Sequence, residues 1–182
     1  MIKFIIFGFL SILVIILSWR SLFNLKSHGF YRFLSWECMI WLLSCNYKFW
    51  FTDPFGIRQL LSWTFLIVSA FMILAGVIMM RKIGKPARDR NDKTLYRFEQ
   101  TSQLVDRGIF NYIRHPLYAS LLFLTWGIYL KHITLPLLVV ALLSTVFLYL
   151  TAIADEKECM VYFGDSYKDY MKRSKRFIPY LF

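Results

Sequence analysis

The chain has 182 residues, of which 58% are hydrophobic and 19% aromatic, and its formal net charge is +11 at pH 7. Its mean hydropathy of +0.49 excludes an ordinary soluble domain and predicts a polytopic membrane protein. The length allows one compact helix bundle rather than two domains. The positive charges lie between apolar runs, so membrane topology and anionic lipid headgroups explain them, and we expect no nucleic-acid partner.

Five apolar runs follow one another along the chain, separated by charged or turn-forming segments. A helix of about 20 apolar residues crosses the roughly 30 Å hydrocarbon core of a bilayer. We therefore expect an all-α bundle of about five transmembrane helices, a single domain over 1–182 with one long cytosolic loop and a helical cytosolic tail. The expected spans are 4–19, 33–47, 59–80, 111–130 and 133–154, the loop is 81–107, and the tail is 155–182.

Basic residues predict the orientation of these spans. With the N-terminus outside, 18 of the 22 Lys and Arg residues fall on the cytosolic side, as the positive-inside rule requires. The fourth and fifth spans then form a hairpin, which returns Asp155 and Glu156 to the side where Arg114 and His115 lie. The four basic residues left outside are Lys3, Lys48, Arg58 and Lys131.

The first run raises the question of a signal peptide, because it is short and follows a basic residue. Its end, Ser18-Trp19-Arg20-Ser21, is a poor cleavage site, so we expect a retained span.

Cysteines and histidines are spread along the chain without metal-ligand or CxxC spacing, so we expect neither a disulfide framework nor a metal site. They are Cys38, Cys45, Cys159, His28, His115 and His132.

Glu37 is a carboxylate inside the second apolar run, within about one turn of its start. Such a group can face the bundle interior or lie at the membrane interface. We favour an interfacial carboxylate near Arg32.

The motif Arg114-His115-Pro116-Leu117-Tyr118 stands at the start of the fourth run. Pro116 suits the first position of a helix, which places Arg114 and His115 beside an N-terminus that attracts anions. Charge at this depth is costly and often lines a pocket, although juxtamembrane Arg and His also serve as simple interfacial anchors. The motif by itself leaves both interpretations open.

Two segments carry a family resemblance. LVDRGIFNYIRHPLYAS, followed after a hairpin by DEKECMVYFGDSYKDYMKR, resembles the isoprenylcysteine carboxyl methyltransferase family, to which membrane phospholipid methyltransferases are related. The resemblance covers about 104–179. Three positions depart from the family pattern: Ser120 replaces a Gly, Asp155 replaces a Glu, and Phe110 stands where many members have Tyr.

The resemblance implies an integral membrane methyltransferase that uses S-adenosylmethionine, with its active site facing the cytosol and a lipid-like or prenylated substrate from the bilayer. The membrane would be the inner membrane of a prokaryote or the endoplasmic reticulum of a eukaryote, and no obligate protein partner is evident. The resemblance also implies that Arg173 contacts a carboxylate of the substrate. The implied cofactor-binding residues are Arg114, His115, Pro116, Tyr118, Asp155, Glu156, Tyr167 and Tyr170.

The acceptor is open. No dedicated general base stands in the motif, which favours carboxyl O-methylation of an isoprenylcysteine or a similar lipid-like acid, because a carboxylate needs no deprotonation at pH 7. The first alternative is N-methylation of a phospholipid amine. A membrane reductase that uses NADPH and a non-enzymatic accessory protein are further alternatives. No GxG stands in the sequence, which argues against a soluble nucleotide-binding fold.

Overall fold

The computed structural model describes residues 1–84, 99 and 101–179, and this part of the chain is helical without a strand. The expected all-α class is therefore confirmed. Each of the five apolar runs forms one helix, because its residues lack internal breakers, and a short helix follows the fifth. The helices are α1 (Ile2–Leu22), α2 (His28–Asn46), α3 (Ile57–Ile83), α4 (Pro116–Tyr129), α5 (Leu135–Phe163) and α6 (Asp165–Arg173), with 3-10 turns η1 (Tyr47–Phe49) and η2 (Gly108–Asn111).

Three of these helices, α1, α3 and α5, are long and apolar enough to cross a membrane. Helix α4 has 14 residues and reaches about 21 Å, and α2 carries the charged Arg32 and Glu37. The chain is thus an integral membrane protein, and the number of five complete spans stays a prediction.

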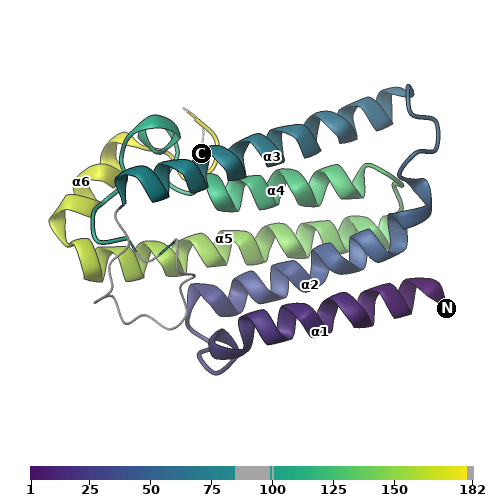
Figure 1. Ribbon diagram of the computed structural model, residues 1–182, viewed down its shortest axis with the longest axis horizontal. Helices are drawn as coiled ribbons and strands as arrows, with labels where there is room; N and C mark the ends of the chain where they lie inside the picture. Colours follow the sequence, from purple (N-terminus) through teal and green to yellow (C-terminus); the bar gives the residue numbers. More distant parts are fainter. Residues whose placement is uncertain (85–98, 100, 180–182) are drawn as a thin grey trace.

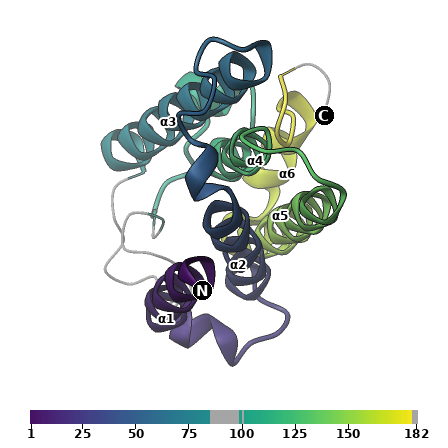
Figure 2. The same ribbon diagram turned by 90° about the vertical axis from the view of Figure 1, so that its right-hand side faces the viewer.

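The long helices run alongside one another, and α6 folds back at one end (Figure 1). Helix α3 packs on α4 and α2 packs on α5, while α1 covers the outer side of α2. Seen end-on, α4 lies in the middle of the group (Figure 2). The α3–α4 contact needs a small residue, because a Cβ on Gly127 would lie 2.9 Å from Leu66 Cδ2.

Hydroxyl groups join the helices inside the bundle. Ser144 of α5 lies 2.9 Å from the Ser35 hydroxyl of α2 and 3.2 Å from the Thr125 hydroxyl of α4. The Ser62 hydroxyl donates to the Gly127 carbonyl at 2.7 Å. Such contacts satisfy polar groups away from water and fix the register of the helices.

Glu37 also lies at a helix contact, where it accepts a hydrogen bond of 2.6 Å from the Ser11 hydroxyl of α1. Its expected neighbour, Arg32, instead pairs with Glu99. The interpretation of Glu37 as an interfacial carboxylate near Arg32 was wrong, because α1 packs on α2 and brings a polar donor to it.

The helix boundaries differ from the expected spans, and three of the differences shape the site. The second helix begins at His28 rather than at 33, so His28 and Arg32 belong to α2. The fourth helix begins at Pro116 rather than at 111, because η2 and a short extended stretch precede it. The fifth helix continues nine residues beyond 154 to Phe163, so Asp155 and Glu156 belong to α5 itself. Gly164, with a φ of +60°, then turns the chain into α6. Of the expected loop 81–107, positions 85–98 and 100 lie outside the described residues.

Helices α4 and α5 lie antiparallel and return the chain to the end of the bundle where α3 terminates. Tags in 81–107 and after Phe182 should therefore report the same side of the membrane, and a tag before Met1 should report the opposite side. Reporter fusions or cysteine labelling in sealed vesicles measure this. Opposite sides for the first two tags would contradict the hairpin.

Candidate active site at one end of the bundle

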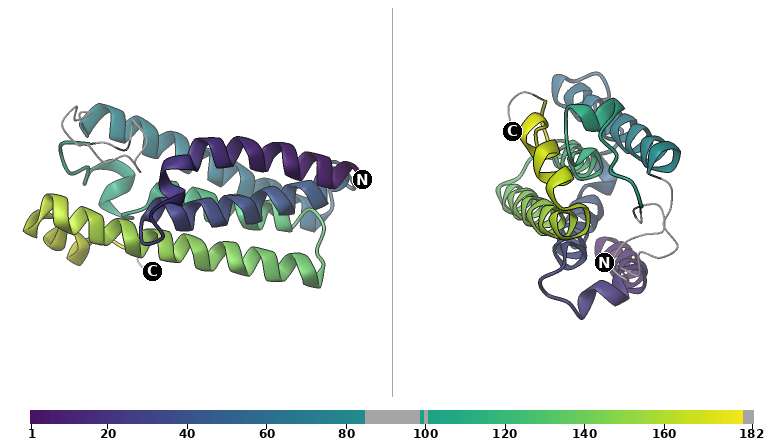
Figure 3. Two further views of the ribbon diagram at one scale, coloured as in Figure 1. Left: turned by 90° about the horizontal axis from the view of Figure 1, so that it is seen from below. Right: turned by 90° about the vertical axis from the view of Figure 1, so that its left-hand side faces the viewer.

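Residues 174–179, which follow α6 and are called the tail from here on, lie against the segment that leads into α4, at the end of the bundle where α6 folds back (Figure 3). Ile113 and Lys175 form an isolated parallel β-bridge. The Arg114 backbone N–H donates to the Lys175 carbonyl at 2.7 Å, and the His115 N–H donates to the Arg176 carbonyl at 3.2 Å. These backbone contacts therefore fix the positions from which the Arg114 and His115 side chains project.

A buried carboxylate connects these segments. Glu156 is only 4% exposed, and Arg114 Nε donates to its Oε1 at 3.0 Å. Arg176 donates to Oε2 from Nη2 at 2.7 Å and to Oε1 from Nε at 3.1 Å. Arg114 Nη1 donates further to the carbonyls of Met171, at 3.2 Å, and Ser174. Glu156 and Arg114 thus hold the tail against α4 and α5.

His115 stands between two carboxylates. Its Nε2 lies 3.3 Å from Glu156 Oε1, and its Nδ1 lies 3.4 Å from Asp155 Oδ2. Burial by itself would lower the pKa of His115, but hydrogen bonds to Asp155 and Glu156 raise it above its ordinary value. The ring also stacks on Tyr118, with centroids 5.3 Å apart.

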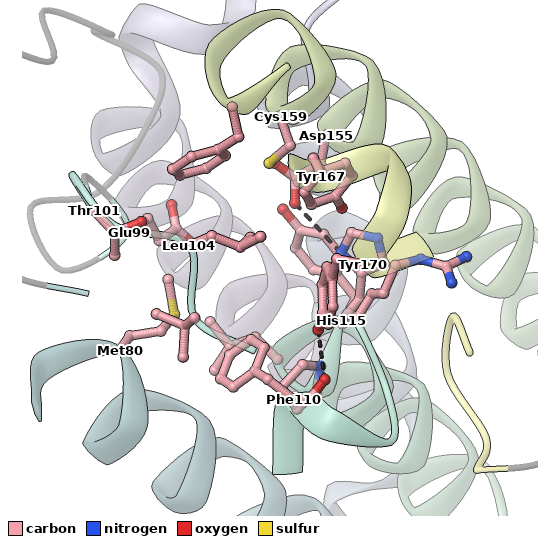
Figure 4. Close-up of a pocket in the computed structure, with 16 residues that line it drawn as sticks. Met80, Glu99, Thr101, Leu104, Phe110, His115, Asp155, Cys159, Tyr167 and Tyr170 are labelled. Atoms are coloured by element: carbon pink, nitrogen blue, oxygen red, sulfur yellow. Dashed lines mark hydrogen bonds and ion pairs between the residues drawn. The ribbon is translucent and has the colours of Figure 1, made fainter. Parts of the chain in front are cut away.

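Beside this network is a pocket with both charged and aromatic walls (Figure 4). Glu99 and Thr101 lie on one side of it, and Asp155, Tyr167 and His115 lie on the other. The charged lining residues in the described part of the chain are Glu99, Arg114, His115 and Asp155; the aromatic ones are Phe110, Tyr118, Phe163, Tyr167 and Tyr170; the others are Met80, Thr101, Leu104, Val105, Pro116, Leu117 and Cys159.

Helix α6 contributes two buried tyrosines to the lining. The Tyr170 hydroxyl donates to the Phe110 carbonyl at 2.6 Å, and burial raises the pKa of both Tyr167 and Tyr170. Phe110 has no hydroxyl, but this contact uses its backbone carbonyl and needs none.

Most of the site residues expected from the sequence come together in this pocket. Glu156 instead lies behind the lining, where it faces Arg114 and Arg176. Arg173 lies elsewhere: its side chain is 54% exposed, pairs with Asp106 and borders a separate surface hollow. The expected residues that line the pocket are Arg114, His115, Pro116, Tyr118, Asp155, Tyr167 and Tyr170.

Several participants were missed by sequence reasoning. Arg176 stands among several basic residues near the end of the chain, and Glu99 stands in a strongly charged segment, so neither has a distinguishing spacing. Arg32, which binds Glu99, lies 67 residues away in the chain. No local pattern could have indicated these pairings.

The histidines, scattered in sequence, partly converge here. His28 Nδ1 lies 2.6 Å from Glu158 Oε2, and the His28 backbone N–H donates to Glu158 Oε1 at 3.2 Å. Three potential metal-ligand atoms lie within 4.8 Å of one another here, one each from His28, Asp155 and Glu158. Glu158 contacts both the ring and the backbone N–H of His28, so it caps the N-terminus of α2, and this role explains the cluster without an ion. The expectation of no metal site stays a prediction.

A family model described as phospholipid methyltransferase matches residues 57–166, which is more than half of the chain. No curated protein and no solved structure matches significantly. The matched region runs from α3 to the start of α6 and leaves out α1 and α2.

Arg176→Ala should destabilise the protein by about 1–3 kcal/mol, because it removes charged hydrogen bonds from a buried carboxylate. Thermal unfolding in detergent measures the change. Lys175→Ala is the matched control, since Lys175 takes part through its backbone and its side chain is exposed. Equal stability of the two variants would show that Arg176 does not hold Glu156.

Proposed function

The chain belongs to the phospholipid methyltransferase family, and from this premise we propose that it transfers a methyl group from S-adenosylmethionine to a lipid-like acceptor. The family makes it a membrane methyltransferase. The cofactor, the acceptor and the cytosolic placement of the site are our proposals. The observation that supports them best is the pocket of paired charges and aromatic rings at the end of an apolar bundle.

The chemistry of the lining fits the cofactor. S-adenosylmethionine has a carboxylate, an ammonium, an adenine ring and a sulfonium, and when bound it supplies an activated methyl group. Asp155 offers a carboxylate to the cationic groups, and the N-terminus of α4 offers backbone donors to the carboxylate, while His115 orients Asp155. Tyr118 and Tyr167 offer aromatic faces to the adenine or the sulfonium.

The contacts of Arg114 favour a positioning role over the direct cofactor binding expected from the sequence. Its Nε and Nη1 are engaged with Glu156 and with carbonyls of the tail, so a bidentate grip on a cofactor carboxylate would break these contacts. We infer that Arg114 positions Glu156 and the tail, and that Glu156 in turn orients His115.

The surroundings of the pocket suit an acceptor that is anchored in the bilayer. Met80 at the end of α3 and Leu117 at the start of α4 line the same pocket as the charged groups. An acyl chain can lie among helices while its polar end reaches the charges. Methyl transfer is an in-line displacement, so the protein contributes chiefly by positioning the reactants and excluding water.

The lining favours an amine acceptor over the carboxylate that the sequence favoured. Glu99 and Asp155 add two carboxylates to the lining; each contacts one cationic residue, Arg32 or His115, and a carboxylate can accept from a further ammonium beside such a partner. The described basic lining residues, Arg114 and His115, are already engaged with carboxylates. Arg173, the expected partner of a substrate carboxylate, pairs with Asp106 away from the pocket. An ammonium headgroup, as in phosphatidylethanolamine, meets complementary charge here. The carboxylate of an isoprenylcysteine is the competing candidate.

His115→Ala and Glu156→Gln should each weaken binding of S-adenosylmethionine about tenfold or more, because each removes charged hydrogen bonds at the pocket wall. Arg114→Lys should weaken it too, since an ammonium cannot make the contacts of the guanidinium fork. Calorimetry on purified, folded protein measures the affinity. Lys157→Ala, on the exposed face of α5, is the control. Unchanged affinity in the first two variants would overturn the assignment of the site.

Membranes that contain the protein should transfer label from the cofactor to phosphatidylethanolamine as base-stable N-methyl product. The rate should rise with pH up to about pH 9–10, because the ammonium must lose its proton before it attacks. A farnesylcysteine analogue offered in the same membranes is the competing substrate. Base-labile methyl ester as the sole product, formed at a rate that is flat above about pH 5, would show that the acceptor is a carboxylate.

A further inference from the structure

Glu99 is a buried carboxylate on the wall of the pocket, and it precedes the segments at 104–179 that carry the resemblance seen in the sequence. It faces the pocket across from His115, Asp155 and Tyr167 (Figure 4). Arg32 Nη1 donates to both of its oxygens, at 2.9 Å and 3.1 Å, and both side chains are buried. Two charged hydrogen bonds to one guanidinium hold this carboxylate in one orientation.

Arg32 belongs to α2, which lies outside the matched family region. It stands one helical turn after His28, so both side chains project from the same face of α2. His28 contacts Glu158 of α5, while Arg32 contacts Glu99. Helix α2 therefore uses two basic side chains to hold two acidic ones at this end of the bundle.

The wall around Glu99 differs from the opposite wall. Met80 and Leu104 lie on the same side as Glu99, whereas His115, Asp155 and Tyr167, which we assign to the cofactor, lie on the other (Figure 4). Apolar neighbours lower the local dielectric and strengthen the attraction between a carboxylate and a cation. The two oxygens of a carboxylate accept several hydrogen bonds, so a second cation can bind beside Arg32.

We propose that Glu99, held by Arg32, binds the ammonium group of the lipid acceptor, and that α2 thereby completes the acceptor side of the pocket. This inference rests on the proposed function, and it deepens it by assigning recognition of the headgroup to a residue. Glu99 touches the acceptor, and Arg32 is a positioning residue that acts through Glu99. The cofactor side of the pocket does not depend on this pair.

Glu99→Gln should raise the KM for phosphatidylethanolamine at least tenfold, because a neutral amide replaces the partner of the ammonium. Its affinity for S-adenosylhomocysteine, measured by calorimetry, should stay within twofold of the wild-type value. Asp165→Asn is the control, since Asp165 forms an exposed pair with Lys168 and is absent from the lining of the pocket. It should change neither quantity.

The double variant Arg32→Gln/Glu99→Gln separates binding from folding, because it removes both members of the buried pair and leaves no uncompensated charge. It should recover thermal stability lost in Glu99→Gln while its KM for the lipid stays high. Recovery of the wild-type KM in the double variant would overturn the proposal by showing a structural role alone. An unchanged KM in Glu99→Gln, or an equal loss of S-adenosylhomocysteine affinity, would overturn it as well. Absence of N-methyl product with the wild-type protein would instead refute the proposed function.

Discussion

The buried carboxylate of Glu156 imposes the constraint on which the organisation of the site depends. An ionised carboxylate removed from water is stable only when cations and donors surround it. Arg114 and His115 supply them from the start of α4, and Arg176 supplies them from the tail. Because these partners come from segments far apart in the chain, the tail, α4 and α5 must meet at this point for the charge to be satisfied.

Helix α5 links this network to the pocket through two consecutive residues. Successive side chains of an α-helix point about 100° apart, so Asp155 and Glu156 face different surroundings although they are neighbours. Asp155 reaches the pocket and contacts His115, while Glu156 reaches Arg176. One helix thus presents one carboxylate to the pocket and another to the tail, and His115 contacts both.

The opposite end of the bundle is closed by a buried cation. Lys131 is fully buried; its Nζ donates to Gln59 Oε1 at 3.0 Å and lies 3.6 Å from the ring centroid of Trp63. These contacts replace water around the ammonium and join the α4–α5 turn to α3. The α4–α5 hairpin is therefore fixed at its turn as well as at its open end, which keeps His115 and Asp155 in register.

The sequence by itself determined the helices and the side of the bundle on which the site lies. Apolar runs without breakers can bury their backbone groups in a bilayer only as helices, and Pro116 suits the start of a helix. The α4–α5 hairpin then necessarily brings His115 and Asp155 to one end. Only the tertiary structure decided which charged groups pair, because a chain with 22 basic and 11 acidic residues allows many pairings without a local signal. Packing of α2 against α5, and of the tail against α4, selected among them: Arg32 with Glu99, Arg176 with Glu156, and Arg173 with Asp106.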